Sequence, residues 1–251
     1  MRIFLLILSV ISPIFLSGKE TKKITNDRGY PAFREVYYVL KADTNIRHGS
    51  YRAEILGKVA VKGFYQMGYK DSLWTQYNLQ GKIRSRGWYE HGKRDSIWEF
   101  FNHSGEIEQR INFTRNEVLL YQTAFLDVPF RVMNGKDTIL TVLERPPLFI
   151  GGTSRFNDYV ADEIMIPLHK ADEKITGTVY VAFTIDKEGK TSNHRVLKGI
   201  GKVCNAEALR VMMTIPDDWI PGRLNGENVA VDYVVPFKFD KSITTIDSLF
   251  Q

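Results

Sequence analysis

The stretch that decides the fold of the C-terminal part is Gly177-Thr-Val-Tyr-Val-Ala-Phe-Thr-Ile-Asp-Lys-Glu-Gly-Lys190. Its apolar residues alternate along the chain, which is the period of a strand with one buried face. The side chains on that face are Val179, Val181, Phe183 and Ile185. Glu188-Gly189 then turns the chain, and residues 193–197 return beside it. The sequence therefore predicts a half-buried antiparallel hairpin here.

Helical spacing of apolar residues appears on both sides of this hairpin. Residues 153–166 form one such segment, and Asn205 is placed to cap a second helix that continues through Met213. Residues 229–239 alternate again and predict a final strand. Its inward side chains are Val231, Tyr233, Val235 and Phe237. The predicted fold class is α+β with an antiparallel sheet, in the order helix, β-hairpin, helix, strand.

Several spaced motifs punctuate this segment. They are Glu144, Pro147, Phe149 and Gly151-Gly152, then Pro167 and Ala171, the stretch from Gly177 to Lys190, Glu207 to Arg210, and finally Pro216, Trp219, Pro221-Gly222 and Asn225-Gly226. Together they resemble the C-terminal domain of TonB in its Bacteroidetes-like form. Ile150 and Ile166 depart from the family, which usually has proline and tyrosine there. The resemblance implies a domain that binds another protein and does not catalyse a reaction.

The resemblance also implies where a partner binds. In the TonB family, a short segment of an outer-membrane transporter adds as a strand to the edge formed by the final strand, whose unpaired N–H and C=O groups provide affinity. The implied partner-binding edge strand consists of Val229, Ala230, Val231, Asp232, Tyr233, Val234 and Val235, within a candidate surface that extends to Phe237. The alternative is an edge that is solvated or that forms a homodimer.

The region before this domain is built from repeats with a period of 24 residues, seen at Gly57, Gly81 and Gly105. The clearest pair is Gly68-Tyr-Lys-Asp-Ser-Leu-Trp74 and Gly92-Lys-Arg-Asp-Ser-Ile-Trp98. Short alternating runs between glycine-containing breaks predict two strands per repeat. These units resemble MORN-type repeats, which form an elongated all-β meander because one repeat buries its apolar face only against a neighbour.

Three tryptophans of the repeats admit two interpretations. Trp74, Trp88 and Trp98 recur in register with the strand pattern, which predicts that they belong to the core. The alternative is a platform of exposed rings on which sugars stack.

The change of period and the prolines set the expected domain organisation. The expected parts are a signal peptide at 1–18, the repeat domain at 30–122, a bridging hairpin at 123–143, the TonB-like domain at 144–240 and a tail at 241–251. The bridging hairpin centres on Asn134-Gly135, a strong hairpin signal. Glu144-Arg145-Pro146-Pro147 suits an extended linker, and the two domains are expected to fold independently.

The first 18 residues have the composition of an export signal, with Arg2, an apolar run and small residues at Ser17-Gly18. We expect cleavage and a location in the periplasm or cell envelope. The alternative is an uncleaved inner-membrane anchor, but a spanning helix takes about 20 apolar residues, and Ser12-Pro13 interrupts this run. Membrane association is expected only in that case.

Charge and composition exclude several classes of function. The formal net charge is +5, and the basic residues are scattered among acidic ones, so nucleic acid is not an expected partner. The single cysteine, Cys204, excludes an internal disulfide and a multi-thiolate metal site, and it is expected to be buried. The histidines lack metal-ligand spacing. We expect no cofactor, no metal and no catalytic residues.

The sequence as a whole predicts a non-catalytic protein-interaction module of the cell envelope. An outer-membrane transporter is the candidate partner, with a link to TonB-dependent transport. Energy transducers of the family use an uncleaved membrane helix and a long proline-rich segment, whereas this chain has 9 prolines and carries repeats in that place. The resemblance therefore implies the protein-binding role of the domain more strongly than it implies energy transduction. The alternative function is an envelope scaffold whose repeats bind a cell-wall or membrane component.

Overall fold

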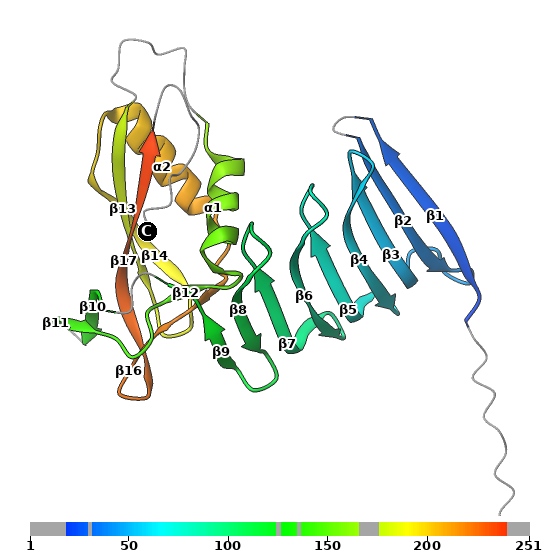
Figure 1. The fold of residues 1–251 in the computed structure, drawn as a ribbon, viewed down its shortest axis with the longest axis horizontal. Coiled ribbons are helices and arrows are strands. Elements are labelled where there is room, and N and C mark those ends of the chain that lie inside the picture. Colours follow the sequence, from blue (N-terminus) through cyan, green and yellow to red (C-terminus); the bar gives the residue numbers. More distant parts are fainter. Residues whose placement is uncertain (1–18, 30–31, 124–126, 135–136, 166–175, 240–251) are drawn as a thin grey trace, which may run out of the picture.

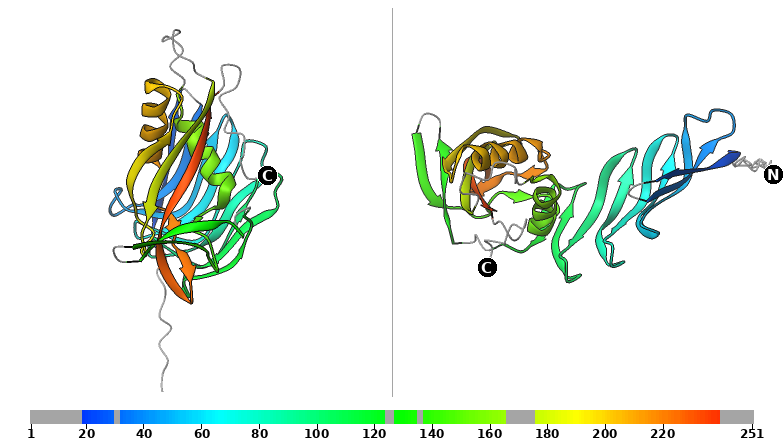
Figure 2. Two further views of the ribbon diagram at one scale, coloured as in Figure 1. Left: turned by 90° about the vertical axis from the view of Figure 1, so that its left-hand side faces the viewer. Right: turned by 90° about the horizontal axis from the view of Figure 1, so that it is seen from above.

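The computed structural model describes residues 19–29, 32–123, 127–134, 137–165 and 176–239. An elongated sheet leads into a two-layer C-terminal domain (Figure 1). Seen from above, the sheet twists steadily along its length before it reaches that domain (Figure 2). The expected signal peptide at 1–18 and the tail at 241–251 lie outside the described residues.

The elongated sheet, called the repeat sheet below, is an antiparallel meander in which each strand pairs with the next. Its strands are β1 (Thr21–Arg28), β2 (Phe33–Leu40), β3 (Arg47–Ile55), β4 (Lys58–Gln66), β5 (Tyr69–Tyr77), β6 (Ile83–Glu90), β7 (Lys93–Phe101), β8 (Ile107–Asn112) and β9 (Glu117–Tyr121). Two strands per repeat are present, as the glycine spacing predicts. The sheet begins at Thr21, earlier than the expected boundary at residue 30.

Two-residue turns explain the glycine spacing. Leu56-Gly57, Met67-Gly68 and His91-Gly92 each join neighbouring strands, and both residues of each pair have positive φ. This is a type I′ turn, whose twist suits antiparallel strands and whose second position favours glycine. Longer loops follow β5 and β7, and in them the side chains of Asn78 and Asn102 accept backbone N–H groups. One tight turn and one loop make up each of the two clearest repeats, whereas both ends of β4 have tight turns.

Two tryptophans form the centre of the repeat sheet's apolar face. Trp74 and Trp98 are each 3% exposed, and each lies over a glycine of the preceding strand, Gly63 and Gly87 respectively. A Cβ atom at Gly87 would lie 2.2 Å from the Trp98 ring. These positions need glycine because a side chain would displace the indole. The prediction that Trp74 and Trp98 belong to the core is confirmed.

The C-terminal domain packs two helices on one face of a sheet with the strand order β11-β10-β17-β13-β14. The helices are α1 (Gly152–Glu163) and α2 (Lys202–Thr214). The strands are β10 (Pro129–Asn134), β11 (Asp137–Val142), β13 (Gly177–Ile185), β14 (Thr191–Lys198) and β17 (Glu227–Phe239). The short strands are β12 (Leu148–Phe149), β15 (Trp219–Ile220) and β16 (Gly222–Leu224). The predicted α+β order is present.

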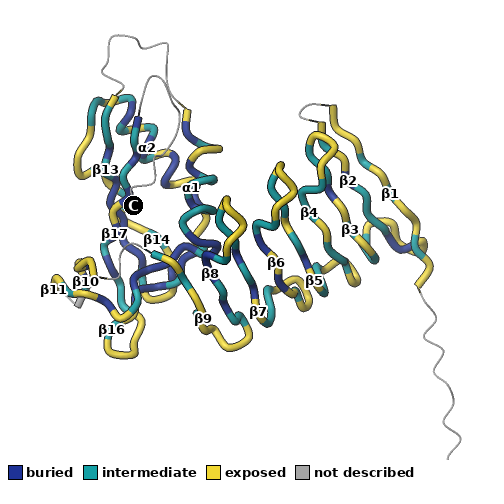
Figure 3. The backbone as a smooth tube through the Cα atoms, viewed as in Figure 1, coloured by how far each residue is buried: buried dark blue, intermediate teal, exposed yellow. Residues whose placement is uncertain are grey.

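Burial in this domain follows the predicted alternation. The residues that face the helices are fully or almost fully buried, and they are Val179, Val181, Phe183, Ile185, Val231, Tyr233, Val235 and Phe237. Cys204 is also buried, as expected. Figure 3 shows this buried backbone concentrated in β13 and β17, while β1 and β11 are largely exposed. The hydrophobic effect at this interface stabilises the layered arrangement.

The structure corrects three local expectations. α2 starts at Lys202, so Asn205 lies in its first turn and its side chain accepts the N–H of Ile200. The hairpin around Asn134 is present in its two strands, yet β10 pairs with β17, so it belongs to the C-terminal sheet instead of bridging two domains. The turn of this hairpin, at 135–136, lies outside the described residues.

The expected linker is the third correction. Arg145 exchanges backbone hydrogen bonds with Arg223, and Glu144 accepts the N–H of Gly226. Pro146 is fully buried. The prolines keep the chain extended as predicted, but the segment packs against the end of the C-terminal sheet and is part of that domain.

Candidate partner-binding surface

β17, the strand that the resemblance singles out as the partner-binding edge, lies inside the sheet for part of its length. On one side it pairs with β13 from Val231 to Phe239. On the other side, residues 227–229 pair with β16 and residues 230–232 pair with β10. The expectation of an open edge is therefore wrong for Val229, Ala230, Val231 and Asp232. The physical reason is that β16 pairs with Val229, while the β10–β11 hairpin folds back and pairs with residues 230–232.

The side chains of β17 alternate as predicted. Val231, Tyr233 and Val235 point toward the helices, and burial raises the pKa of Tyr233 above its ordinary value. On the opposite face, the carboxylate of Asp232 accepts hydrogen bonds from Thr184 and Arg195. Val234 on that face is 41% exposed. On the outer face of β17, Asp232 is therefore hydrogen-bonded and Val234 is exposed to solvent.

Two prolines shape the remainder of this edge. In the register of β10 and β17, Pro129 falls opposite Val234, and it has no N–H to donate. Pro236 pairs with Tyr180 of β13 and likewise lacks an N–H. Along a strand, the backbone N–H and C=O groups of every second residue point to the same side. Because Pro236 has no N–H for β13, we infer that the backbone groups of Val234 and Pro236 point away from β13. No described strand pairs with that stretch of β17, which offers one N–H and two carbonyl groups.

A groove of about 410 Å³ lies where β10 separates from β17. Its lining includes exposed apolar side chains, namely Leu140, Leu197 and Val234, and the charged side chains of Arg131, Arg195 and Asp232. An apolar groove beside an incompletely paired strand suits an extended segment with alternating apolar side chains. Of the candidate residues, Tyr233 and Val234 contribute to this groove.

The N-terminus of α1 is held by side chains of the repeat sheet. The carboxylate of Glu108 accepts the N–H of Ser154 at 3.1 Å. Gln109, which is 1% exposed, donates to the carbonyl of Phe149 and accepts the N–H of Gly151. The first N–H groups of a helix lack partners within it, and a carboxylate also suits the helix dipole there. The start of α1 therefore depends on β8.

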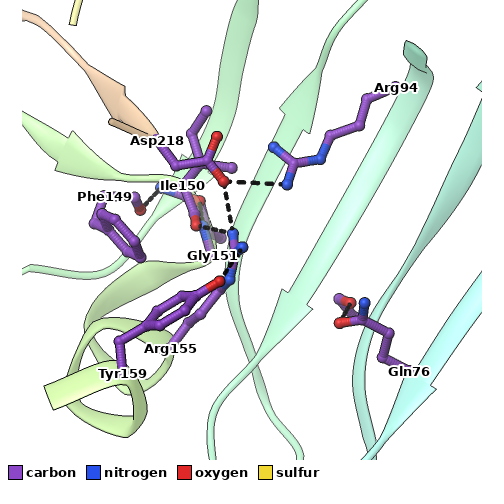
Figure 4. Close-up of polar contacts among 10 residues, drawn as sticks. Gln76, Arg94, Phe149, Ile150, Gly151, Arg155, Tyr159 and Asp218 are labelled. Carbon is purple, nitrogen blue, oxygen red and sulfur yellow. Dashed lines mark hydrogen bonds and ion pairs between the residues drawn. The ribbon is translucent and has the colours of Figure 1, made fainter. Parts of the chain in front are cut away.

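A carboxylate from the C-terminal domain completes this junction. One oxygen of Asp218 lies 3.2 Å from a guanidinium nitrogen of Arg94 and 3.2 Å from one of Arg155 (Figure 4). Arg155 also donates to the carbonyl of Ile150 and to the hydroxyl of Tyr159. The two domains thus share capping and ion-pair contacts that the prediction of independent folding did not include.

The sequence contained a signal for Glu108 and Gln109 that pattern reasoning missed. At a period of 24 residues they correspond to Arg84 and Ser85 of the preceding repeat. The change to a carboxylate and an amide marks the repeat that meets the C-terminal domain. A buried polar side chain is retained where it satisfies backbone groups, and this role explains the departure.

Trp88 differs from the other two tryptophans. It is 50% exposed, on the face of the sheet opposite Trp98, and it pairs across the strands with Leu73, which is also exposed. The prediction that all three tryptophans are core residues is wrong for Trp88, because its strand turns alternate residues to solvent.

Within the described part of the chain, no group of three His, Cys, Asp or Glu side chains could hold a metal ion. The same residues include no helix that is long and apolar enough to cross a membrane.

In the comparison with known proteins, one family model matches part of the C-terminal domain. Residues 167–240 match the family model described as Gram-negative bacterial TonB protein C-terminal. The match supports a TonB C-terminal domain in this chain. It spans β13, β14, α2 and β17, so the resemblance inferred from the motifs is confirmed for this segment. The MORN-type resemblance of the repeats and the Bacteroidetes-like origin stay predictions.

No curated protein matched the chain. One solved structure, described as the crystal structure of TarM, is 10% identical with a TM-score of 0.24, and the alignment covers 39% of this chain. The chain spans 21% of that protein's length.

Proposed function

We propose that this chain is a non-catalytic protein-interaction module of the bacterial cell envelope that binds a partner segment by strand addition at β17. The match of residues 167–240 to the TonB C-terminal family carries this proposal. The sheet formed by that segment supports it, since β17 is the outer strand of the matched residues in the order β17-β13-β14. The candidate partner is a segment of an outer-membrane transporter, which links the chain to TonB-dependent transport.

The partner segment takes the place of β10 in this proposal. β10 pairs with β17 through only three residue pairs, and the outer strand β11 is mostly exposed. What holds β10 is the burial of Phe130 and Val132, with the Phe130 ring stacked on Tyr233 at 6.0 Å. A partner with apolar residues two positions apart could bury equivalent area and also pair with Val234.

A reversible cross-link tests this exchange. Met133 and Ala230 lie directly opposite each other in β10 and β17, at a separation that a disulfide can span. The double variant Met133→Cys/Ala230→Cys fixes the hairpin when oxidised and releases it when reduced. The reduced chain is expected to retain an outer-membrane transporter from envelope extracts, and the oxidised chain is expected to lose it.

The single variant Met133→Cys is the matched control, because it carries the same thiol without the cross-link. Its capture of the transporter should not depend on oxidation. Equal capture by the oxidised and reduced double variant would contradict exchange at β17. Recovery of peptidoglycan without a transporter would instead favour the scaffold function.

A further inference from the structure

One face of the repeat sheet carries a continuous row of rings and cations. Rings of Tyr51, Tyr65, Trp74, Tyr89, Trp98 and Phe113 contact one another in sequence, with centroid separations between 5.0 and 6.3 Å. Over them lie the cationic groups of Arg47, Lys70 and Arg94. We name these nine residues the cation–aromatic row. Such contacts stabilise a cation that is partly removed from water.

Both ends of the row have a carboxylate. Arg47 lies 3.3 Å from a carboxylate oxygen of Glu35 in β2. Arg94 lies 3.2 Å from Asp218, which the C-terminal domain supplies. The row therefore pairs its terminal cations with acidic side chains from outside the aromatic ladder.

The middle cation is different. The ammonium of Lys70 lies 4.6 Å from the centroid of the Trp74 ring and 5.2 Å from that of Tyr89. Among the residues that the structure describes, no carboxylate lies within ion-pair distance of it. Burial lowers the pKa of Lys70, and the charge of Arg94 lowers it further. A half-buried ammonium without a counter-charge is a favourable place for a carboxylate.

The molecule itself contains an example of what this row binds. Lys70 and Arg94 are 24 residues apart, so they hold equivalent positions in successive repeats. Asp218 docks on Arg94, and two positions later Ile220 packs against the apolar cluster around Trp98. Pro216 and Pro221 flank this segment and keep it extended. The recognised chemistry is a carboxylate next to a branched apolar side chain, on an extended chain.

We propose that Lys70, with Trp74 and Tyr89, binds an acidic side chain of an extended segment of a partner protein. A branched apolar residue near that acid would pack against the apolar cluster that includes Trp74 and Trp98, as Ile220 does. The charge of the row favours this occupant, because Lys70 and Arg94 are close enough to repel each other and a carboxylate relieves that repulsion. This surface is separate from β17, so the proposal does not rest on strand addition.

The test uses the full chain and two labelled peptides. The first copies residues 215–222, Ile-Pro-Asp-Asp-Trp-Ile-Pro-Gly, and the second has Asn in place of both Asp residues. Fluorescence anisotropy at low salt measures binding. The acidic peptide is expected to bind the unmodified chain, and Lys70→Gln is expected to weaken that binding by about tenfold, as loss of a charge-assisted contact does.

Two control variants, the Asn peptide and an anionic polysaccharide provide the controls. Lys70→Arg keeps the charge and should keep binding, while Lys58→Gln removes an exposed cation away from the rings and should change binding less than about twofold. The Asn peptide should bind weakly to every variant. Equal binding by Lys70→Gln, equal binding of the Asn peptide, or no binding of the acidic peptide would overturn the proposal. Binding of polygalacturonate through Lys70, without binding of the acidic peptide, would instead assign the surface to an anionic polysaccharide.

Discussion

The repeat sheet and the C-terminal domain bury their apolar residues in different ways. In the C-terminal domain, a sheet and two helices enclose side chains such as Phe183 and Phe237, which are completely buried. The repeat sheet is a single layer, in which Trp74 and Trp98 are covered by rings of neighbouring strands and by a cation of their own strand, Lys70 and Arg94 respectively. Each repeat therefore depends on its neighbours, whereas the C-terminal core involves elements far apart in sequence.

This difference teaches where each region can bind. A single layer leaves the cations of the cation–aromatic row partly exposed above the buried Trp74 and Trp98, while a two-layer domain leaves only its strand edges and outer face. Ile150 and Ile220 of the C-terminal domain pack against the buried cluster formed by Trp74, Trp98, Phe100 and Ile111. The C-terminal domain thus closes one end of the repeat sheet, and the repeat sheet in return supplies Glu108 and Gln109 to α1.

The largest effect is expected from Phe183→Ala. Phe183 is fully buried and contacts the rings of Trp219, Tyr233 and His194. Its truncation is expected to lower the free energy of unfolding of the C-terminal domain by about 3–5 kcal/mol. Hydrogen exchange should show lost protection in β13 and β17. Strands β2 to β5 should keep their protection, because their backbone hydrogen bonds are made with neighbouring strands of the repeat sheet; a parallel loss there would contradict the contrast between the two regions.

Gly87→Ala is the complementary variant, because it destabilises the repeat sheet and not the C-terminal domain. A Cβ atom would lie 2.2 Å from the Trp98 ring, so the indole must move. We expect a loss of about 3 kcal/mol, typical of overpacking, with exchange protection lost first in β6 and β7. Gly29→Ala is the control, because none of the described residues beyond its chain neighbours lies within 4 Å of its Cβ position. A Gly87→Ala chain as stable as this control would show that the ring is loosely packed.

The sequence predicted local elements well and their long-range pairing poorly. The alternation around Phe183 and the glycine spacing predicted the hairpin and the repeats, because both are short-range consequences of strand period and turn chemistry. The position of β10 was not predictable in the same way. Its strand pattern was recognised, but pairing with β17 joins residues such as Val132 and Val231, about a hundred positions apart, and no local signal specifies that partner.

The candidate site shows the same limit. The inward and outward residues of β17 followed from alternation, yet whether Asp232 lies on an open edge depends on where another hairpin folds. The junction was missed for a related reason. Neither Arg94 nor Asp218 stands out in the sequence, and only the packing of the C-terminal domain against the end of the repeat sheet brings them within 3.2 Å.

Gln109→Ala tests the mutual dependence of the two regions. The variant leaves the carbonyl of Phe149 and the N–H of Gly151 without their buried partner. We expect the free energy of unfolding to fall by about 2 kcal/mol, the cost of unsatisfied buried groups. Both regions should be affected in urea denaturation, since the amide lies between them. Gln80→Ala, at an exposed loop position, should have little effect.

Independent folding would give a different result. If the C-terminal domain folds without the repeat sheet, Gln109→Ala should leave exchange protection at the start of α1 and in β12 unchanged. A selective loss of protection at those two places would show that β8 stabilises the neighbouring domain.

The smallest expected effect is a pH dependence of stability that the C-terminal domain has through His194 and the repeat sheet lacks. His194 of β14 stacks on Phe183 at 5.5 Å, and burial lowers the pKa of its imidazole below the ordinary value of 6.5, although the charge of Asp217 opposes this shift. Its Nε2 atom has no hydrogen-bond partner among the described residues. The unfolded chain therefore binds this proton more readily than the folded chain does.

Because the folded-state pKa is depressed, the stabilisation from neutral His194 is complete above pH 6.5 and is lost as pH falls through the folded-state value. Urea midpoints measured between pH 7.5 and pH 5 should therefore decline for the C-terminal domain, and His194→Gln should flatten that decline. His91→Gln changes an exposed turn of the repeat sheet and should leave the decline intact. An equal slope in His194→Gln and the unmodified chain would move the pH sensitivity away from β14, and the contrast between the regions would then rest on packing alone.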